Sequence, residues 1–159
     1  MARVLFSAHG LPKKVIAAGD PYQWQVERTA AAVVERLGKD GLDWQVCYQS
    51  RVGPLEWIRP YTEDEIRRAG VEGKAVAIIP IAFVSEHSET LVELDVEYRH
   101  LAESAGVPKY VRAPTVSTDE SFIEGLAVLV ESALRRGTGL VSEGDGRRCP
   151  AVCRRCPLE

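Results

Sequence analysis

The sequence lacks three features that would assign it to whole classes of protein. It contains no apolar run close to the ~20 residues that a bilayer-spanning helix requires. It has no basic excess, since 20 Lys and Arg accompany 23 Asp and Glu, so binding along a nucleic-acid backbone has no electrostatic support. Its N-terminus has no basic-then-apolar secretory layout. We therefore expect a cytoplasmic protein that binds no nucleic acid.

Histidine and cysteine are scarce, with 3 and 4 copies, so few side chains can bind a transition metal. Cys47 stands in an apolar stretch and is expected to be a small buried side chain of a strand. Cys149, Cys153 and Cys156 crowd near the end of the chain, close enough to share one metal centre. We therefore separate a globular domain, 1–137, from a cysteine-rich tail, 138–159.

Short apolar runs alternate with stretches of helical periodicity along the globular domain. Strands are predicted at 4–8, 44–48, 75–83 and 109–112, and helices at 22–37, 62–70, 88–105 and 119–136. This alternation implies right-handed crossovers, and it predicts an α/β fold of three α/β/α layers around a four-stranded parallel sheet. In the last helix, five apolar side chains are expected to face inward: Phe122, Leu126, Leu129, Val130 and Leu134.

One histidine follows the first predicted strand directly. His9 precedes Gly10 and lies at the carboxyl end of that strand, where open parallel sheets bind their ligands. Ser50 and His87 emerge at the same edge. An imidazole can accept protons near neutral pH or bind a metal ion. The alternative is a histidine that is only hydrogen-bonded to the backbone.

Acidic residues follow the most apolar predicted strand. Glu86 and His87 precede Glu89, Glu93 and Glu97, whose spacing by four places three carboxylates along one flank of the predicted helix. No Lys or Arg stands four residues after Glu89 or Glu93 to relieve their repulsion. Such a line of carboxylates can pass a divalent cation or carry protons. A solvated helix face without a site is the alternative.

The loop after the second predicted strand carries Arg51 and Trp57. Arginine can pair with a carboxylate, and tryptophan can pack against a flat ring system. Both side chains can equally serve the fold alone.

Three segments match, in order and at similar spacing, the signatures of one enzyme family. They are Leu5-Phe6-Ser7-Ala8-His9-Gly10-Leu11-Pro12 with Gly19-Asp20-Pro21-Tyr22, then Gln49-Ser50-Arg51-Val52-Gly53-Pro54, then Pro80-Ile81-Ala82-Phe83 with Glu86-His87-Ser88-Glu89-Thr90-Leu91-Val92-Glu93. The chain thus resembles the ferrochelatases along nearly all of its length. The resemblance implies a chelatase-like lobe of Rossmann or flavodoxin type that inserts ferrous iron into protoporphyrin IX to form protohaem, without an organic cofactor.

The resemblance also implies roles for single residues. His9 takes the pyrrole protons or receives iron, and Glu89 is the acidic partner opposite it. The resemblance also implies His87, Glu93 and Glu86 along the acidic metal path. It implies Trp57, Phe83 and Arg51 in the porphyrin pocket.

The chain is shorter than the family it resembles. Ferrochelatases fold as two similar lobes, and the resemblance concerns only the second, so it implies a catalytic lobe that is incomplete without an N-terminal lobe or a second copy. Histidine and carboxylate do not select iron by affinity alone. A cobalt or nickel chelatase acting as a homodimer, and a non-catalytic haem- or metal-binding lobe, therefore stay open. Peripheral contact with the inner membrane is a further expectation.

The cysteine-rich tail carries a separate expectation. Some ferrochelatases hold an iron-sulfur cluster on a cysteine-rich C-terminus, and the resemblance implies Cys149, Cys153 and Cys156 as ligands of a [2Fe-2S] cluster. Such a cluster takes four cysteines. The fourth ligand would therefore come from the missing lobe.

Overall fold

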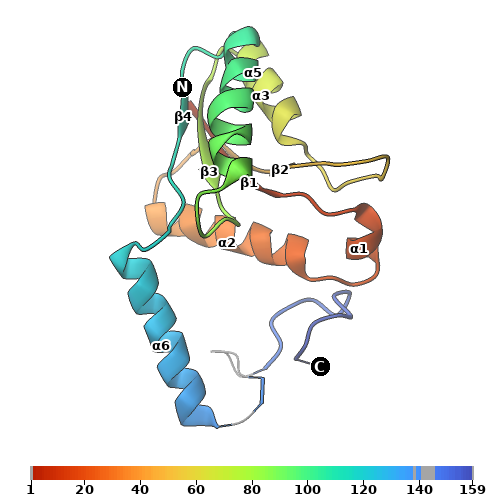
Figure 1. Ribbon diagram of the computed structural model, residues 1–159, viewed down its shortest axis with the longest axis vertical. Coiled ribbons are helices and arrows are strands. Elements are labelled where there is room, and N and C mark those ends of the chain that lie inside the picture. The colour runs from red at the N-terminus through yellow and green to blue at the C-terminus, as the bar shows by residue number, and fades with distance from the viewer. Residues whose placement is uncertain (1, 138, 141–145, 159) are drawn as a thin grey trace.

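A parallel sheet forms the centre of the computed structural model, which describes residues 2–137, 139–140 and 146–158 (Figure 1). All four strands run parallel, in the order β2-β1-β3-β4. This confirms the predicted α/β fold and its four-stranded parallel sheet. Because the chain leaves β1 toward β2 on one side and later returns to β3 on the other, the sheet has a topological switch point between β1 and β3. The strands are β1 (Ala2–His9), β2 (Trp44–Gln49), β3 (Ala75–Pro80) and β4 (Tyr110–Arg112).

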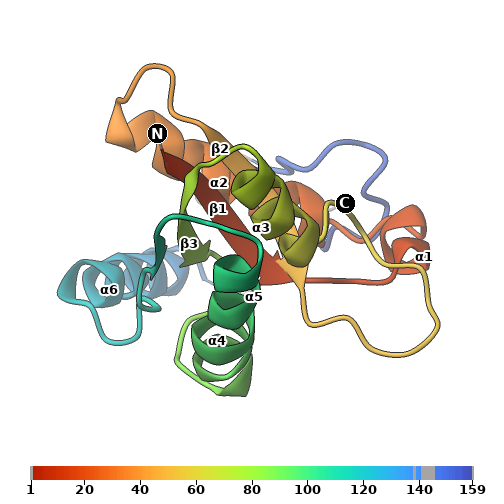
Figure 2. The same ribbon diagram turned by 90° about the horizontal axis from the view of Figure 1, so that it is seen from above.

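Helices cover both faces of this sheet, as Figure 2 shows from above. On one face, α2 (Tyr22–Leu37) packs through Val26 and Ala30. On the other face lie α3 (Thr62–Val71) and α5 (Tyr98–Ser104). The neighbouring residues Leu5 and Phe6 of β1 belong to the two different core clusters, as the alternation of side chains along a strand requires.

Glycine sets the close packing of α3 against the end of α5. A Cβ atom at Gly70 would lie 2.1 Å from the carbonyl oxygen of Ala105, which is too close for any side chain. A larger residue at this position would push the two helices apart.

Two elements differ from the predicted ranges near the carboxyl edge of the sheet. A short helix, α1 (Lys13–Ala17), was not predicted. Strand β3 ends at Pro80 and not at Phe83, because proline has no N–H for the ladder and the chain turns there, with Phe83 N–H donating to Pro80 O.

The predicted continuous helix 88–105 is wrong. The segment consists of α4 (Ser88–Leu91), a π-helical turn η1 (Glu93–Glu97) and α5. In the π turn, Glu97 N–H donates to Val92 O at 3.0 Å, a step of five residues. π-turns are frequent at functional sites, and this one inserts a residue into a periodicity that otherwise indicates one helix.

The last helix, α6 (Glu120–Arg136), corrects a second prediction. None of its residues is buried, so the prediction that its apolar side chains face inward is wrong. Figure 1 shows α6 standing away from the sheet. The physical reason is that the described chain supplies no surface against which the apolar side of α6 packs.

The described tail residues, 146–158, lie beside the turn before α2, where Arg155 N–H donates to Gly19 O at 3.0 Å. The predicted start of the tail, residue 138, lies outside the described residues. Among the helices of the described ranges, we find none long and apolar enough to cross a membrane.

Candidate functional site

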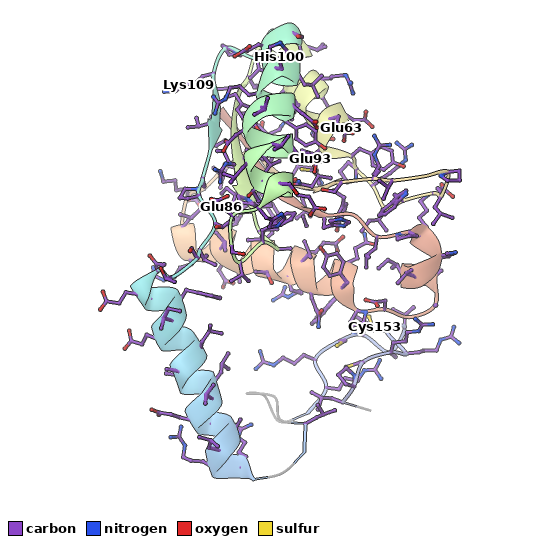
Figure 3. The ribbon with its side chains drawn as sticks, in the orientation of Figure 1. Glu63, Glu86, Glu93, His100, Lys109 and Cys153 are labelled. Carbon is purple, nitrogen blue, oxygen red and sulfur yellow. The ribbon has the colours of Figure 1, made fainter. Side chains whose placement is uncertain are left out.

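A cleft of about 620 Å³ opens at the carboxyl edge of the sheet, beside the switch point. It is bounded by the end of β1, the loop after β2, the start of α3 and the α4–η1–α5 segment. Figure 3 shows two of its acidic residues, Glu63 and Glu93, on the same side of the sheet. The residues that line the cleft are His9, Ser50, Arg51, Val52, Gly53, Glu63, Ser88, Glu89, Val92, Glu93, Glu97 and Tyr98.

His9 presents one ring nitrogen to the cleft. Its Nδ1 lies 2.6 Å from Gly10 O, and because a carbonyl only accepts, Nδ1 carries the proton. In neutral His9 the lone pair therefore lies on Nε2, which is 3.4 Å from Glu89 Oε1. Tyr22 O–H donates to the backbone carbonyl of His9 at 2.9 Å and holds the strand end in place. The imidazole is thus oriented to accept a proton or bind a metal beside a carboxylate.

A buried tryptophan packs behind this histidine. The rings of His9 and Trp57 have centroids 6.3 Å apart, and Trp57 is 7% exposed. A Cβ atom at Gly10 would lie 3.1 Å from the Trp57 ring and 3.1 Å from Gln49 O, so glycine allows this close approach. Trp57 supports His9 and is not among the residues that line the cleft.

Glu93 accepts hydrogen bonds from four donors. They are the Nε2 amide of Gln49 at 3.0 Å, the N–H of Ser50 at 2.8 Å, the hydroxyl of Ser50 and the hydroxyl of Tyr98 at 2.8 Å. Ser50 has a left-handed backbone, φ 62°, which lets its N–H and its hydroxyl reach the same carboxylate. Such strain is typical of functional sites. Burial, and then the charge of Glu93, raise the pKa of Tyr98 well above 10, so its hydroxyl stays a donor.

Gln49 was missed as a site residue by the sequence reasoning. Its side chain is fully buried and accepts from Ser7 Oγ at 2.7 Å, while its Nε2 donates to the backbone carbonyl of Glu89 at 2.8 Å. It therefore joins the core of the sheet to the segment that carries Glu89 and Glu93. The sequence did offer one signal, a glutamine at the end of a strand that is predicted to be buried, because a buried polar side chain is normally hydrogen-bonded.

Glu89, Glu93 and Glu97 all line the cleft, as their spacing predicted. Within the described part of the chain, no Lys or Arg forms an ion pair with any of the three. Arg51 also lines the cleft, but its guanidinium pairs with Glu63 at 2.8 Å and lies 3.7 Å above the ring of Tyr61. The cleft therefore carries carboxylate charge that no Lys or Arg of the described residues neutralises, and such oxygens are suitable ligands for a cation.

The loop before α4 holds the remaining predicted site residues, and none of them lines the cleft. His87 caps α4 by accepting the N–H of Glu89 at its Nδ1, 3.2 Å away. Its ring contacts buried Phe83 at a tilt of 48°, with centroids 5.2 Å apart. Glu86 pairs with Arg112 at 2.8 Å and accepts Thr115 N–H at 3.0 Å.

The charge on Glu86 is stabilised in place. Burial alone would raise the pKa of Glu86, but hydrogen bonds from Thr90, Arg112 and Thr115 outweigh it and lower that pKa to about 2. Glu86 therefore connects β4 to the loop that leads into the site, and Figure 3 shows it apart from Glu93.

The tail brings two of its three cysteines together. The sulfur atoms of Cys149 and Cys156 are 3.1 Å apart, and Cys153 and Cys156 are buried. Cys47 is fully buried in the sheet, and burial raises the pKa of its thiol to about 12. Among the described residues, no group of three or more His, Cys, Asp or Glu has the arrangement of a metal site.

Comparison with known proteins adds a family match. The family model described as "Ferrochelatase" matches residues 1–134. Ferrochelatases from Caulobacter vibrioides, Phenylobacterium zucineum and Rickettsia bellii are 59%, 56% and 52% identical to this chain over 98%, 97% and 98% of its length. The chain spans 44% of each of these relatives.

A solved structure is similar in fold. It is a cobalamin (vitamin B12) biosynthesis CbiX protein from Marinobacter aquaeolei, with a TM-score of 0.63 and 15% identity. The match covers 86% of this chain and 100% of that one. At this identity the likeness concerns the fold alone.

Proposed function

This chain belongs to the ferrochelatase family, and from that premise we propose that its cleft is the metal-inserting half of a site that places ferrous iron in protoporphyrin IX to form protohaem. The observation that carries the proposal is the pair of His9 and Glu89, 3.4 Å apart at the carboxyl edge of the sheet. Because the chain spans 44% of the relatives it matches, the complete reaction requires the rest of such a protein.

The proposed chemistry exchanges two pyrrole protons for one iron ion. His9 accepts a proton at Nε2, since Gly10 fixes the other proton on Nδ1. Glu89 then stabilises the imidazolium, takes this proton from Nε2 and releases it to solvent, which frees His9 to accept the second pyrrole proton in the same way. Glu93 and Glu97 supply oxygen ligands along the wall by which Fe²⁺ enters.

The other predicted site residues receive narrower roles in this proposal. Arg51 lines the cleft and contacts the porphyrin. Trp57 and Phe83 hold the rings of His9 and His87, against which they pack. His87 and Glu86 hold the loop before Glu89 and do not bind iron. The supporting observation is that these last four residues lie outside the cleft lining.

The experiment is porphyrin metallation by the 159-residue chain, alone and with a supplied first lobe. We expect steady turnover only with the lobe, and its loss in His9→Ala and in Glu89→Gln. His100→Ala is the matched control, because His100 is an exposed histidine of α5 whose side chain is 86% exposed. Retained turnover in either site variant would refute the assignment, and ordinary rates from the chain alone would refute its incompleteness.

Two alternatives are separated by the same assay. Competition among Fe²⁺, Co²⁺ and Ni²⁺ distinguishes a ferrochelatase from a cobalt or nickel chelatase. Steady turnover with Zn²⁺ as a surrogate excludes a non-catalytic haem- or metal-binding lobe.

For the cellular location, we propose the cytoplasm with peripheral contact at the inner membrane. Fractionation of cells tests this location.

For the tail, we propose that Cys149, Cys153 and Cys156 ligate a [2Fe-2S] cluster. Arg147 supports it, because its guanidinium donates to the carbonyls of Cys149 and Cys153 and bends the tail into a loop. Cys47 does not supply the fourth ligand, since it is buried in the sheet with a raised pKa. A bound cluster would cross-link the tail to the lobe that supplies that ligand.

The cluster is tested by its visible absorption. A complex of the chain with a supplied first lobe, purified without oxygen, should absorb in the visible range and lose that absorption in Cys153→Ser. Cys47→Ala is the control and should keep it. A colourless complex would count against the cluster.

A further inference from the structure

The cysteine-rich tail contacts the globular domain at Gly19, in the turn that joins α1 to α2. Arg155 N–H donates to Gly19 O at 3.0 Å, and a Cβ atom at Gly19 would lie 2.7 Å from the backbone nitrogen of Arg154. Gly19 also has a left-handed backbone, with φ 95°. Only glycine therefore lets the tail lie directly on this turn, and Figure 3 shows Cys153 beside it.

Hydrogen bonds within the tail form a compact loop that presents the Arg155 N–H to the turn. Cys153 N–H donates to Pro150 O at 2.9 Å, and Cys156 N–H donates to Cys153 O at 3.0 Å. The guanidinium of Arg147 donates to the carbonyls of Pro150 and Cys153, each at 2.8 Å. Because the loop is shaped by its own bonds, it contacts the turn as one preformed unit.

The same turn leads into Tyr22, the first residue of α2. Asp20 Oδ1 accepts the N–H of Tyr22 at 2.9 Å, which fixes the start of the helix to the turn. Tyr22 O–H donates to the backbone carbonyl of His9 at 2.9 Å. Burial raises the pKa of Tyr22 to about 12, so this hydroxyl keeps its proton and stays a donor at neutral pH.

The bond from Tyr22 acts on the His9 ring through one peptide group. The peptide between His9 and Gly10 is held at both ends, because its carbonyl accepts from Tyr22 and its N–H donates to Gln49 O at 2.8 Å. This rigid plane sets the position of the next carbonyl, Gly10 O. That carbonyl accepts the Nδ1 proton of His9 and so leaves Nε2 to the cleft. Without the Tyr22 hydroxyl, one end of the peptide would be free to rotate.

We propose that Tyr22 is a positioning residue for His9, and that the tail holds Tyr22 in place by docking on Gly19. None of the described tail residues, 146–158, lines the cleft, so the tail acts through the turn. A displacement of about 1 Å near a reacting group can cost about 100-fold in rate, which makes such support consequential. The proposal rests on the role proposed above for His9 in iron insertion, and it does not depend on what the tail cysteines bind.

The test is the nitrogen-15 NMR spectrum of the imidazoles in the 159-residue chain, recorded at mildly alkaline pH. The chain has 3 histidines, and His9→Ala assigns the signals of His9. In the wild type, His9 should show a single tautomer with the proton on Nδ1, because Gly10 O accepts it. This measurement needs neither iron nor porphyrin, so its result is independent of the metallation assay.

Two variants break the connection at its two steps. Tyr22→Phe deletes the hydroxyl that donates to His9, and Arg155→Pro deletes the N–H that donates to Gly19. Both should shift the His9 signals toward a mixture of the two tautomers, whereas the signals of the other two histidines stay unchanged. Arg155→Pro should also speed hydrogen exchange at the Tyr22 amide about tenfold, because the turn loses its support.

Each variant has a matched control. Arg155→Ala keeps the backbone N–H, and Tyr110→Phe removes a hydroxyl that donates to a different backbone carbonyl, Leu94 O, at 2.8 Å. Both controls should keep the wild-type His9 signals. An unchanged tautomer in Tyr22→Phe would overturn the positioning role, and an unchanged tautomer in Arg155→Pro would overturn the action of the tail. A shift of the His9 signals in either control would also overturn the proposal, because the effect would then not be specific to this connection.

A second measurement uses the complex of this chain with a supplied first lobe. Tyr22→Phe should lower the kcat of porphyrin metallation about tenfold and leave the KM for porphyrin unchanged, because a misplaced base slows proton transfer without weakening porphyrin binding. A raised KM with an unchanged kcat would contradict the positioning role. If the wild-type complex showed no turnover, the proposal of iron insertion would fail, while the NMR spectra would still decide whether the tail and Tyr22 orient His9.

Discussion

The two ends of the central sheet differ in how their charged side chains are paired. At the amino end, buried Arg3 pairs with Asp43 at 3.0 Å and with Glu72 at 2.9 Å, and Lys74 pairs with the same two carboxylates. Hydrogen bonds, first from Lys74 and then from Arg3, lower the pKa of Glu72 to about 2. Every charge of this cluster has an opposite charge beside it.

At the carboxyl end, Glu63 pairs with Arg51, but Glu89, Glu93 and Glu97 form no ion pair with a Lys or Arg of the described residues. Glu93 accepts from an amide, a backbone N–H and two hydroxyls, and Glu89 has His9 as its partner. Neutral donors fix the position of a carboxylate without cancelling its charge, so this end keeps an attraction for cations that the amino end does not have. The difference separates a cluster that stabilises the fold from one that serves a ligand.

The largest effect is expected at the amino end. Arg3→Ala should lower the free energy of unfolding by about 3 kcal/mol, because it removes a buried side chain with its charged hydrogen bonds to Asp43 and Glu72 and leaves Lys74 alone to pair with both. Urea denaturation followed by circular dichroism measures this loss. Arg67→Ala, which removes an exposed pair with Asp64, should cost less than about 1 kcal/mol. Equal effects of the two variants would contradict the structural role of the amino-end cluster.

Glu86 tests whether the loop before α4 is anchored by a charged hydrogen bond. Glu86→Gln should lower the free energy of unfolding by about 2 kcal/mol at pH 7, since Arg112 loses one of its two anionic partners and keeps only Asp95. The folded-state pKa of Glu86 is about 2 against an ordinary 4.5, so the carboxylate stabilises the protein above pH 4.5 and this contribution is lost as the pH falls toward 2.

The check on Glu86 is the difference between wild type and variant as a function of pH. That difference should be constant above pH 5 and shrink between pH 4.5 and 2. A difference that does not change across this range would show that Glu86 carries no depressed pKa.

The sequence predicted the residues that parallel strands deliver to one edge. His9 and the loop with Glu89 follow β1 and β3, which are neighbours in a sheet of this topology, so their meeting follows from the fold. Gln49 and Tyr98 were missed, because their bonds to Glu89 and Glu93 depend on where the π turn falls. No periodicity in the sequence shows an inserted residue in a helix.

The error at α6 has a different origin. Helical periodicity predicts an apolar side correctly, and Leu126 and Val130 do share one. Periodicity does not say which surface covers that side, and we assumed that the chain itself supplied it. Glu86 lies outside the cleft lining for a related reason, because its partner Arg112 lies 26 residues away and no local pattern joins them.

Tyr98 tests the hydrogen bonds at the carboxyl end. Tyr98→Phe should lower the free energy of unfolding by about 1.5 kcal/mol, because its hydroxyl donates to a charged acceptor, Glu93. Tyr110→Phe is the matched control, since that hydroxyl donates at the same 2.8 Å to a neutral carbonyl, that of Leu94, and should cost about 1 kcal/mol. Thermal and urea unfolding of both variants would measure the difference, and a larger loss in Tyr110→Phe would contradict a charged Glu93.

The smallest effect on stability is expected at Glu97, and it separates the two ends most sharply. Glu97→Gln should leave the free energy of unfolding unchanged or raise it by a few tenths of a kcal/mol, because a like charge four residues from Glu93 is removed. The same change should weaken Zn²⁺ binding about tenfold, or ~1.4 kcal/mol, in calorimetry. Glu103→Gln, on the exposed surface of α5, should leave Zn²⁺ binding unaltered. If Glu97→Gln destabilised the protein as Arg3→Ala does, the carboxylates of the cleft would be part of the fold's support, and the contrast between the two ends of the sheet would fail.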